Sequence, residues 1–324
     1  MAEIRFGKAV NQALAECMEE DPSVILLGED IGQAEGSFKV TRGLLEKFGP
    51  DRVLDTPISE AAIVGAAVGA AMSGLKPVVE IMFMDFITLA MDALVNQASK
   101  ARFMFGGQCS IPIVVRTPHG GGLNAGPQHS QCLEAWLAHV PGLKVVCPST
   151  PSDAYHLFKA SVADPDPVIF VENKALYAVS GDLNPGETPH DIGRARTVRA
   201  GDDVTIVSYG AAVHTVLSAS RTLESEGISA EVIDLRSLQP WDEEAVFDSV
   251  ARTHRLVIVH EAVKSFGVGA EIAARVAEDA FDELDSPVVR VGAPFMPVPF
   301  GKSLEAQYIP AAAAVLAGVR KTIS

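Results

Sequence analysis

The stretch that decides the fold runs from Asp55 to Glu60 and reads DTPISE, and it is followed at once by AAIVGAAVGAAMSG at residues 61–74. A glycine and a proline at 49–50 mark a turn before it. The alanine- and glycine-rich run after it has the composition of a helix. These patterns place the carboxylate of Glu60 at a helix N-terminus, where the helix dipole favours a negative charge. Two interpretations remain open from this pattern alone, a helix-capping residue and a functional acid.

Gly65 and Gly69 stand four residues apart in this helix, so both lie on one face. A glycine inside a helix costs about 1 kcal/mol relative to alanine. A chain tolerates that cost where another helix or a ligand comes close. We expect helix packing at this face, and it hints at a tight contact between subunits.

The composition describes a chain that can bury a large core. Its 324 residues are 48% hydrophobic, and the net charge is −15, from 26 Lys and Arg against 41 Asp and Glu. This acidity argues against a general nucleic-acid binder, which needs a basic face. No apolar run reaches the roughly 18 residues that a membrane span requires, and the first twenty residues carry no signal-peptide pattern. We expect a cytoplasmic protein that binds neither nucleic acid nor membrane.

The four cysteines are scattered and form no CxxC pair, so their spacing supports neither a structural zinc site nor a disulfide scaffold. They are Cys17, Cys109, Cys132 and Cys147.

Short apolar strands alternate with helices, which is typical of α/β folds with doubly wound parallel sheets. The first half predicts helices at 5–20, 61–74, 86–103, 128–136 and 153–162, and strands at 24–27, 78–82, 111–116, 144–147 and 167–171. The second half predicts strands at 204–209, 230–235, 256–260 and 288–291, and helices at 211–226, 242–252 and 267–282.

Residues 178–200 interrupt this alternation with the polar run SGDLNPGETPHD, and we interpret them as a linker. The boundary falls near residue 190, so the sequence predicts one domain over 1–185 and a second over 190–324.

Polar residues gather at expected strand ends and helix starts of the first half. Glu29 and Asp30 follow the strand at 24–27, Glu60 opens a helix, and His129 follows a glycine-rich loop that begins at His119. Ligands of open α/β sheets bind at the carboxyl ends of strands. Glu29, Glu60 and His129 are therefore the candidate polar constellation, although turn and capping roles would also explain the acids.

The phosphate-binding P-loop, the GxGxxG fingerprint and the GxSxG nucleophile motif are all missing.

Several long motifs in order resemble one family. They are GED (28–30), DTPISE (55–60), QHSQ (128–131), PGLKVVCPSTPSDA (141–154), DPDPVIFVENKALY (164–177), GDDVTIVSYG (201–210), AEVIDLRSLQPWD (230–242) and LVIVHEAV (256–263). Over essentially its whole length, the chain resembles the β subunit of the thiamine-diphosphate-dependent first component of 2-oxo acid dehydrogenase complexes. The resemblance implies a transketolase-like pyrimidine-binding domain followed by a transketolase C-terminal domain.

The resemblance also implies roles for individual residues. Glu60 matches the acid that drives tautomerisation of the cofactor's aminopyrimidine. Such an acid works best in an apolar pocket, which we expect neighbours such as Ile58 to form. His129 matches a histidine near the reactive carbon that assists acyl transfer to the lipoyl arm and meets the substrate carboxylate. The other expected cofactor-binding residues are Glu29 near the pyrimidine, Ile58, Met82, where many relatives carry Gln, and Phe86 packed over the pyrimidine ring.

Two metal ions follow from the resemblance. The Gly-Asp-Gly segment with a later Asn that holds Mg²⁺ and the diphosphate is absent, so the resemblance implies that an α subunit supplies it within an α2β2 tetramer. A structural K⁺ is expected at the loop that carries Ser161, Val162, Asp164 and Asp166.

The leading hypothesis is oxidative decarboxylation of pyruvate or a branched-chain 2-oxo acid with reductive acylation of lipoamide, active only with the α subunit. The expected partners include a dihydrolipoyl acyltransferase core with lipoyl and subunit-binding domains. Acetoin cleavage by the same cofactor is an alternative, as is a non-catalytic scaffold of the same fold. A transketolase-like sugar transfer would need the missing Mg²⁺ motif in this chain.

Overall fold

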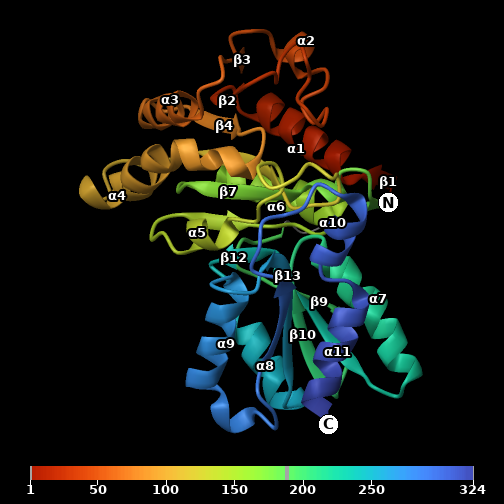
Figure 1. Ribbon diagram of the computed structural model, residues 1–324. Coiled ribbons are helices and arrows are strands. Elements are labelled where there is room, and N and C mark those ends of the chain that lie inside the picture. The colour runs from red at the N-terminus through yellow and green to blue at the C-terminus, as the bar shows by residue number, and fades with distance from the viewer. Residues whose placement is uncertain (1, 187–189, 324) are drawn as a thin grey trace.

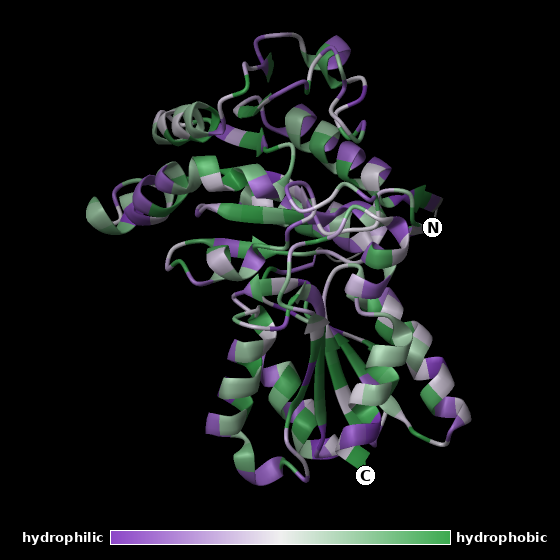
Figure 2. Ribbon diagram, in the orientation of Figure 1, coloured by the Kyte–Doolittle hydropathy of each residue, from purple (hydrophilic) through white to green (hydrophobic). Residues whose placement is uncertain are grey.

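The computed structural model describes residues 2–186 and 190–323 of the chain, folded around two sheets that follow one another down the molecule (Figure 1). Hydrophobic residues run along the strands of both sheets, and the helices alternate hydrophobic and hydrophilic residues (Figure 2). No helix in the described ranges combines the length and apolar character needed to cross a membrane.

The N-terminal sheet has seven strands in the order β12-β6-β7-β5-β4-β2-β3, and only β12 runs antiparallel to its neighbour. Its strands are β2 (Val24–Gly28), β3 (Val53–Asp55), β4 (Lys76–Glu80), β5 (Val114–His119), β6 (Lys144–Val146), β7 (Val168–Asn173) and β12 (Ser237–Gln239). Its helices are α1 (Phe6–Glu20), α2 (Leu44–Phe48), α3 (Glu60–Met72), η1 (Met84–Ala90), η2 (Ala93–Ala98), α4 (Ser99–Met104), α5 (Glu134–Ala138), α6 (Pro151–Ala163) and η3 (Lys174–Leu176).

Helices cover both faces of this sheet, because successive strand residues point to opposite sides. Val78 joins the core formed with α1 and α6, whereas the next residue, Val79, joins the core formed with α3 and η1. The expectation of a doubly wound α/β sheet is confirmed.

The C-terminal sheet has five strands in the order β14-β13-β10-β11-β9, with β9 antiparallel at one edge. The strands are β9 (Arg196–Arg199), β10 (Val204–Ser208), β11 (Ala230–Asp234), β13 (Leu256–Val263) and β14 (Val289–Ala293). The helices are α7 (Ala212–Ser225), α8 (Glu243–Thr253), α9 (Val268–Asp279), η4 (Phe281–Glu283), α10 (Lys302–Tyr308) and α11 (Ala312–Ile323). Here too the helices pack on both faces.

One strand crosses between the two halves of the chain. Strand β12 follows β11 in sequence, yet it pairs with β6 at the edge of the N-terminal sheet. One hydrophobic cluster accordingly contains Val145 of β6 together with Val207 of β10 and Ile233 of β11. The two sheets therefore share a continuous core.

The predicted linker at 178–200 is wrong where the structure describes it. β8 (Ser180–Leu183) pairs antiparallel with β1 (Ala2–Arg5), and β9 pairs with β11. Both pairings join residues far apart in sequence, so the local polar pattern gives no sign of them. Residues 187–189 of the predicted linker lie outside the described part.

Two helix predictions are corrected. The continuous helix expected at 86–103 is a 3₁₀ helix, a π-helical turn and a short α-helix in succession, and Ser99 Oγ donates to the Val95 carbonyl within the irregular part. Such back-bonding disturbs the regular hydrogen-bond ladder. The helix expected from Gln128 begins only at Glu134, because the backbone and side-chain amides of Gln131 are bound to Asp85.

Candidate functional site

Three neighbouring parallel strands bring the predicted site residues to one edge of the sheet. Gly28 at the end of β2 pairs with Asp55 at the end of β3 and with Glu80 at the end of β4. The segments that follow these strands carry Glu29, the DTPISE stretch and the residues from 81 to 86. β5 lies beside β4, and the glycine-rich loop leading to His129 leaves its carboxyl end. The sequence-based grouping of these segments is thus reproduced by the topology.

Glu60 is the first residue of α3 and is only 6% exposed. Its carboxylate makes no hydrogen bond with any residue that the structure describes. Glu29 lies within electrostatic range of Glu60. Burial raises the pKa of Glu29, and the charges of Asp30 and Glu60 raise it further. A buried acid without a hydrogen-bond donor among the described residues, beside a second acid, is suited to bind a nitrogen heterocycle with ring-nitrogen and amino groups.

The expected apolar pocket around Glu60 is incomplete within this chain. Ile58 is 75% exposed, and Ala61 and Ala62 also face outward, whereas Ile63 is buried. The face that carries Gly65 and Gly69 is open, since a Cβ atom added at either glycine would meet no atom of the described residues within 4 Å beyond its own turn of helix. The helix N-terminus and the glycine face therefore belong to one outward surface of α3.

An aromatic cluster surrounds His129. The ring centroids of Phe83 and Phe86 lie 4.9 and 5.3 Å from the imidazole, both edge-on, and they lie 5.9 Å from each other. Phe38 extends the cluster at 5.9 Å from Phe83. Met82, which directly precedes Phe83 in the sequence, is half-buried. Thus Phe86 and His129, predicted separately, contact each other.

Lys174 is a member of this cluster that the sequence interpretation missed. Its ammonium group donates to the backbone carbonyl of His129 and lies 5.2 Å from the centroid of the Phe83 ring. The residue is 3% exposed, and burial lowers the pKa of its side chain despite the nearby acids. The available signal was a lysine directly after the fully buried strand β7, since a buried lysine needs a specific partner.

The C-terminal half holds the loop that carries His129. Glu261 accepts the backbone amide of Gly121 at 2.5 Å, and Glu305 accepts the amide of Asn124 at 3.0 Å. Gly126 has a φ of +75°, and a Cβ there would lie 2.1 Å from the ring of Phe300. Both the left-handed backbone and the close ring require glycine at this position.

The loop predicted to hold K⁺ already contains paired carboxylates. Lys144 Nζ lies 2.6 and 2.8 Å from the two oxygens of Asp164, and Arg102 Nη1 lies 2.7 Å from Asp166. The Ser161 hydroxyl donates to a helix carbonyl, and Val162 is buried. A K⁺ ion here would have to be bound through backbone carbonyls rather than through free carboxylates.

A buried charge network underlies the site. Arg116 on β5 forms ion pairs of 2.6 Å with Glu80 on β4 and 2.7 Å with Glu172 on β7, and Tyr177 donates to Glu172 at 2.8 Å. These carboxylates raise the pKa of Arg116 despite its burial. The ring of Tyr177 stacks on that of Phe38 with centroids 4.8 Å apart, so the charge network is in contact with the aromatic cluster.

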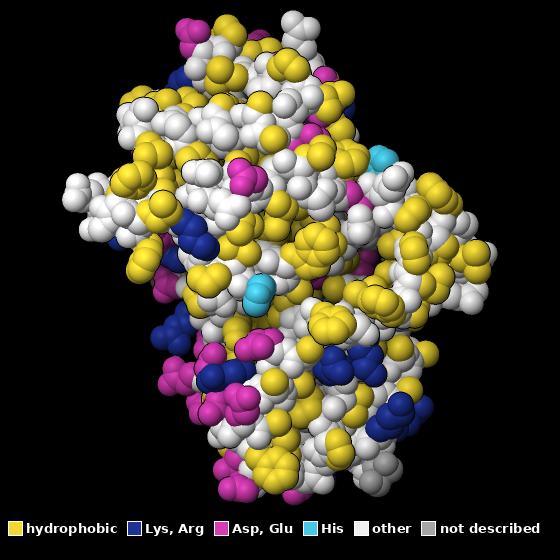
Figure 3. Space-filling view, turned by 60° about the vertical axis from the view of Figure 1, so that its left-hand side comes forward, with side chains coloured by type: hydrophobic (Ala, Val, Ile, Leu, Met, Phe, Trp, Pro, Cys, Tyr) yellow, Lys and Arg dark blue, Asp and Glu magenta, His cyan; other side chains and the backbone are white. Residues whose placement is uncertain are grey.

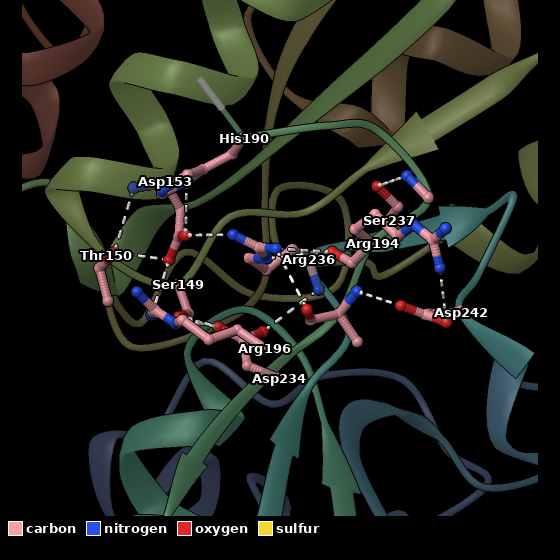
Figure 4. A network of polar contacts seen from close by, with 12 residues as sticks. Ser149, Thr150, Asp153, His190, Arg194, Arg196, Asp234, Arg236, Ser237 and Asp242 are labelled. Atoms are coloured by element: carbon pink, nitrogen blue, oxygen red, sulfur yellow. Dashed lines mark hydrogen bonds and ion pairs between the residues drawn. The ribbon is translucent and has the colours of Figure 1, made fainter. Parts of the chain in front are cut away.

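A second polar network joins the two halves (Figure 4). Asp153 at the start of α6 forms ion pairs with Arg196, Arg236 and His190, at 3.0, 3.4 and 3.2 Å. Asp234 at the end of β11 accepts from Ser149 at 2.5 Å. Burial and the charge of Asp153 raise the pKa of Asp234 to about 7. The network connects the C-terminal ends of β6 and β11.

A large groove lies away from the predicted site residues. It encloses about 1020 Å³ between α5, η2 and α9, and its walls include Trp136, Trp241 and Phe266. On the face shown in Figure 3, hydrophobic side chains are exposed at many places over both halves of the chain. Neither this groove nor a smaller cavity of about 320 Å³ is lined by Glu29, Glu60 or His129.

Comparison with known proteins agrees with this architecture. Residues 2–179 match the model of the transketolase pyrimidine-binding domain, and residues 193–315 match that of the transketolase C-terminal domain. A solved structure described as a split-gene transketolase, an inactive β4 tetramer, superposes with a TM-score of 0.82 at 25% identity, covering 99% of this chain and 98% of that chain.

Two curated relatives are equally similar in sequence. The pyruvate dehydrogenase E1 component subunit beta-2 of Oryza sativa is 47% identical over 312 residues, which cover 95% of this chain and 83% of the relative. The β subunit of the acetoin:2,6-dichlorophenolindophenol oxidoreductase of Cupriavidus necator is 47% identical over 325 residues, covering 97% and 96%. With both domain models matched in order and this identity over nearly the whole length, the chain belongs to the transketolase-like family that includes the β subunits of pyruvate dehydrogenase and acetoin oxidoreductase.

Proposed function

We propose that this chain is the β subunit of a thiamine-diphosphate-dependent 2-oxo acid dehydrogenase, which decarboxylates a 2-oxo acid and acylates lipoamide. The observation that carries the proposal is the carboxylate of the buried residue Glu60, which has no hydrogen-bond partner among the described residues and lies at the same sheet edge as the loop that carries His129. Sequence identity of 47% to a pyruvate dehydrogenase β subunit supports it.

In this proposal Glu60 would bind the ring nitrogen of the cofactor's pyrimidine through its carboxyl group and would hold or release a proton there, and Glu29 would lie beside that ring. When bound, thiamine diphosphate supplies the nucleophilic carbon of the reaction. No described residue donates a hydrogen bond to Glu60, which leaves its carboxylate available for this bond. Phe86 and Met82 would contact the pyrimidine face, and Ile58 would pack against the cofactor once a partner chain covers it.

His129 is proposed to bind the substrate carboxylate and to donate a proton during acyl transfer to the lipoyl arm. Its ring is held edge-on by Phe83 and Phe86, and its backbone by Lys174. These contacts restrict the imidazole to a narrow range of positions, which general acid–base catalysis requires.

An α subunit is the proposed partner within an α2β2 tetramer, and it would hold Mg²⁺ and the diphosphate. The open surface around Ile58 and the uncovered glycine face of α3 support a site completed by another chain. We further propose a cytoplasmic complex on a dihydrolipoyl acyltransferase core, docking through its subunit-binding domain and presenting lipoyl domains. A structural K⁺ at the loop of residues 161–166 is also proposed, bound through backbone carbonyls.

Acetoin oxidoreductase is the second candidate function. The relative with that activity in its name is as similar as the pyruvate dehydrogenase subunit and aligns over 96% of its own length. The cofactor half-site would be the same, and the partner chain would distinguish the substrates.

The deciding experiment is co-expression with the α partner, followed by turnover of pyruvate, branched 2-oxo acids and acetoin with thiamine diphosphate, Mg²⁺ and a dye acceptor. Turnover of a 2-oxo acid supports the first proposal, and acetoin turnover with inert oxo acids supports the second. A cofactor-loaded complex that turns over none of them would contradict both and favour a non-catalytic scaffold. Ketol transfer between sugars would instead indicate a transketolase-like activity.

A further inference from the structure

Three side chains with metal-binding donors converge beneath the loop that carries His129. His119 is the last residue of β5, Glu134 is the first residue of α5, and Cys132 lies two residues before Glu134. One ligand atom from each lies within 4.8 Å of the other two, and His119 and Glu134 are buried. The scattered cysteines gave no sign of this cluster, because its ligands come together only when the loop folds back.

The spacing of two donors is informative. His119 Nδ1 and Glu134 Oε2 lie 3.4 Å apart, and both atoms are buried without a hydrogen-bond partner among the described residues. This separation is long for a charge-assisted hydrogen bond, which is about 2.7–2.9 Å. Two ligands of one tetrahedral zinc ion, each at about 2.0–2.1 Å, lie roughly 3.3 Å apart. The pair therefore has the separation of two ligands that share an ion.

The surroundings provide the support that metal ligands need. The Tyr209 hydroxyl donates to the other oxygen of Glu134 at 2.8 Å and so fixes the carboxylate. Hydrogen bonds of this kind orient ligands and commonly change metal affinity about 10- to 100-fold. Cys147 Sγ lies 4.0 Å from His119 Nε2, the ring nitrogen turned away from Glu134. The Cys132 side chain is half-buried, which leaves a path for an ion.

We propose that His119, Cys132 and Glu134 form a binding site for a zinc-type divalent cation. One thiolate and one carboxylate neutralise the two positive charges, and a mixed nitrogen, sulfur and oxygen donor set suits Zn²⁺ and its substitute Co²⁺. The ion would join the end of β5 to the start of α5 and, through Tyr209, to the C-terminal half. It has no part in the thiamine chemistry, so the inference is independent of the proposed function.

Binding of Zn²⁺ would form the sulfur–zinc bond and release the proton of the Cys132 thiol to solvent.

The test is metal binding by the full chain, alone and in complex with its α partner. After treatment with a chelator, the protein is incubated with Zn²⁺ or Co²⁺ and desalted, and bound metal is measured by mass spectrometry. We expect about one ion per chain, and a thiolate-to-cobalt charge-transfer band with Co²⁺. The variants C132A and E134Q should each lower the affinity at least tenfold, and Y209F should lower it about 10- to 100-fold. C109S, at a half-buried cysteine outside the cluster, is the matched control and should bind like the wild type.

A wild-type chain that retains no Zn²⁺ or Co²⁺ would overturn the inference and leave His119 and Glu134 as an ordinary buried pair. Binding that is unchanged in both C132A and E134Q would also overturn it, since the ion would then lie elsewhere. Circular dichroism verifies that each variant is folded. Because the readout is bound metal, a wrong assignment of the catalytic reaction would leave the result unaffected.

Discussion

The buried ammonium group of Lys174 donates to the backbone carbonyl of His129 and lies over the ring of Phe83, which itself contacts the imidazole of His129. One side chain thus restrains both the backbone of the proposed catalytic histidine and the aromatic wall beside it. The position of His129 therefore depends on a residue 45 positions later in the chain.

Replacing Lys174 with Met should impair the step that depends on His129. Hydrogen bonds that involve a charged group contribute about 1.5–3 kcal/mol, so we expect acyl transfer to a lipoyl domain to slow at least tenfold. Decarboxylation measured with a dye acceptor should fall less. Lys174→Arg, which keeps a cationic donor, should recover part of the loss. Equal losses in both assays would show that Lys174 supports the fold in general rather than His129 in particular.

Replacing Glu60 with Gln should remove turnover and preserve assembly. A positioned acid–base group contributes about 10²–10⁴-fold to rate, and we expect a loss in that range in the α2β2 complex. Size-exclusion chromatography should give the wild-type elution volume. Asp30→Asn, at an exposed acid close to Glu29, is the control and should retain activity. Full activity of E60Q would refute the catalytic role.

Replacing Arg116 with Met should be strongly destabilising. Glu80 and Glu172 would be left buried without their cation, and breaking a buried ion pair on one side costs about 3–5 kcal/mol. We expect a much lower urea concentration at the midpoint of unfolding, measured by tryptophan fluorescence. Arg102→Met, which removes the exposed partner of Asp166, should leave the midpoint nearly unchanged. Similar midpoints for the two variants would contradict a structural role for the buried network.

Replacing Asp234 with Asn should change the pH dependence of stability. The folded chain raises the pKa of Asp234 from 3.8 to about 7, so between about pH 4 and pH 7 the folded state holds more protons than the unfolded state. This group therefore favours folding at about pH 4, and that contribution is lost as the pH rises towards 7. Burial and the neighbouring charge of Asp153 cause the shift.

Asp153 acts in the opposite direction, since His190, Arg196 and Arg236 keep its pKa at about 2 despite its burial. Its contribution to stability is present above about pH 4 and is lost as the pH falls towards 2. Unfolding midpoints measured from pH 4 to pH 8 should therefore decline less steeply for D234N than for the wild type. Parallel curves for the two proteins would exclude Asp234 as the titrating group.

The alternation of apolar strands and helices was sufficient to predict two doubly wound sheets, because each buried strand such as β10 is recognisable from its own residues. The outer strands were not predictable in this way. β1 and β8 become strands by pairing with each other across most of the first half. The late start of α5 likewise depends on tertiary contacts, those of Gln131 with Asp85.

Some residues of the candidate site could likewise be predicted from local sequence, and others could not. Glu29, Glu60 and His129 were identifiable because they stand next to strand ends or helix starts, where topology alone places their segments at the same edge of the sheet. The cluster of His119, Cys132 and Glu134 and the contact of Lys174 with His129 depend on how one loop folds over the sheet. No local pattern encodes that geometry.

Strand β12 has a consequence for dividing this chain. Each of the two matched modules, 2–179 and 193–315, is one continuous stretch of sequence. Strand β12 of the second module nevertheless completes the sheet of the first. A fragment ending near residue 190 would leave uncovered the edge of β6 that pairs with β12, and exposed strand edges of this kind promote aggregation. We therefore expect the two modules to fold as one unit, so that a protease cut between them would yield two interdependent pieces.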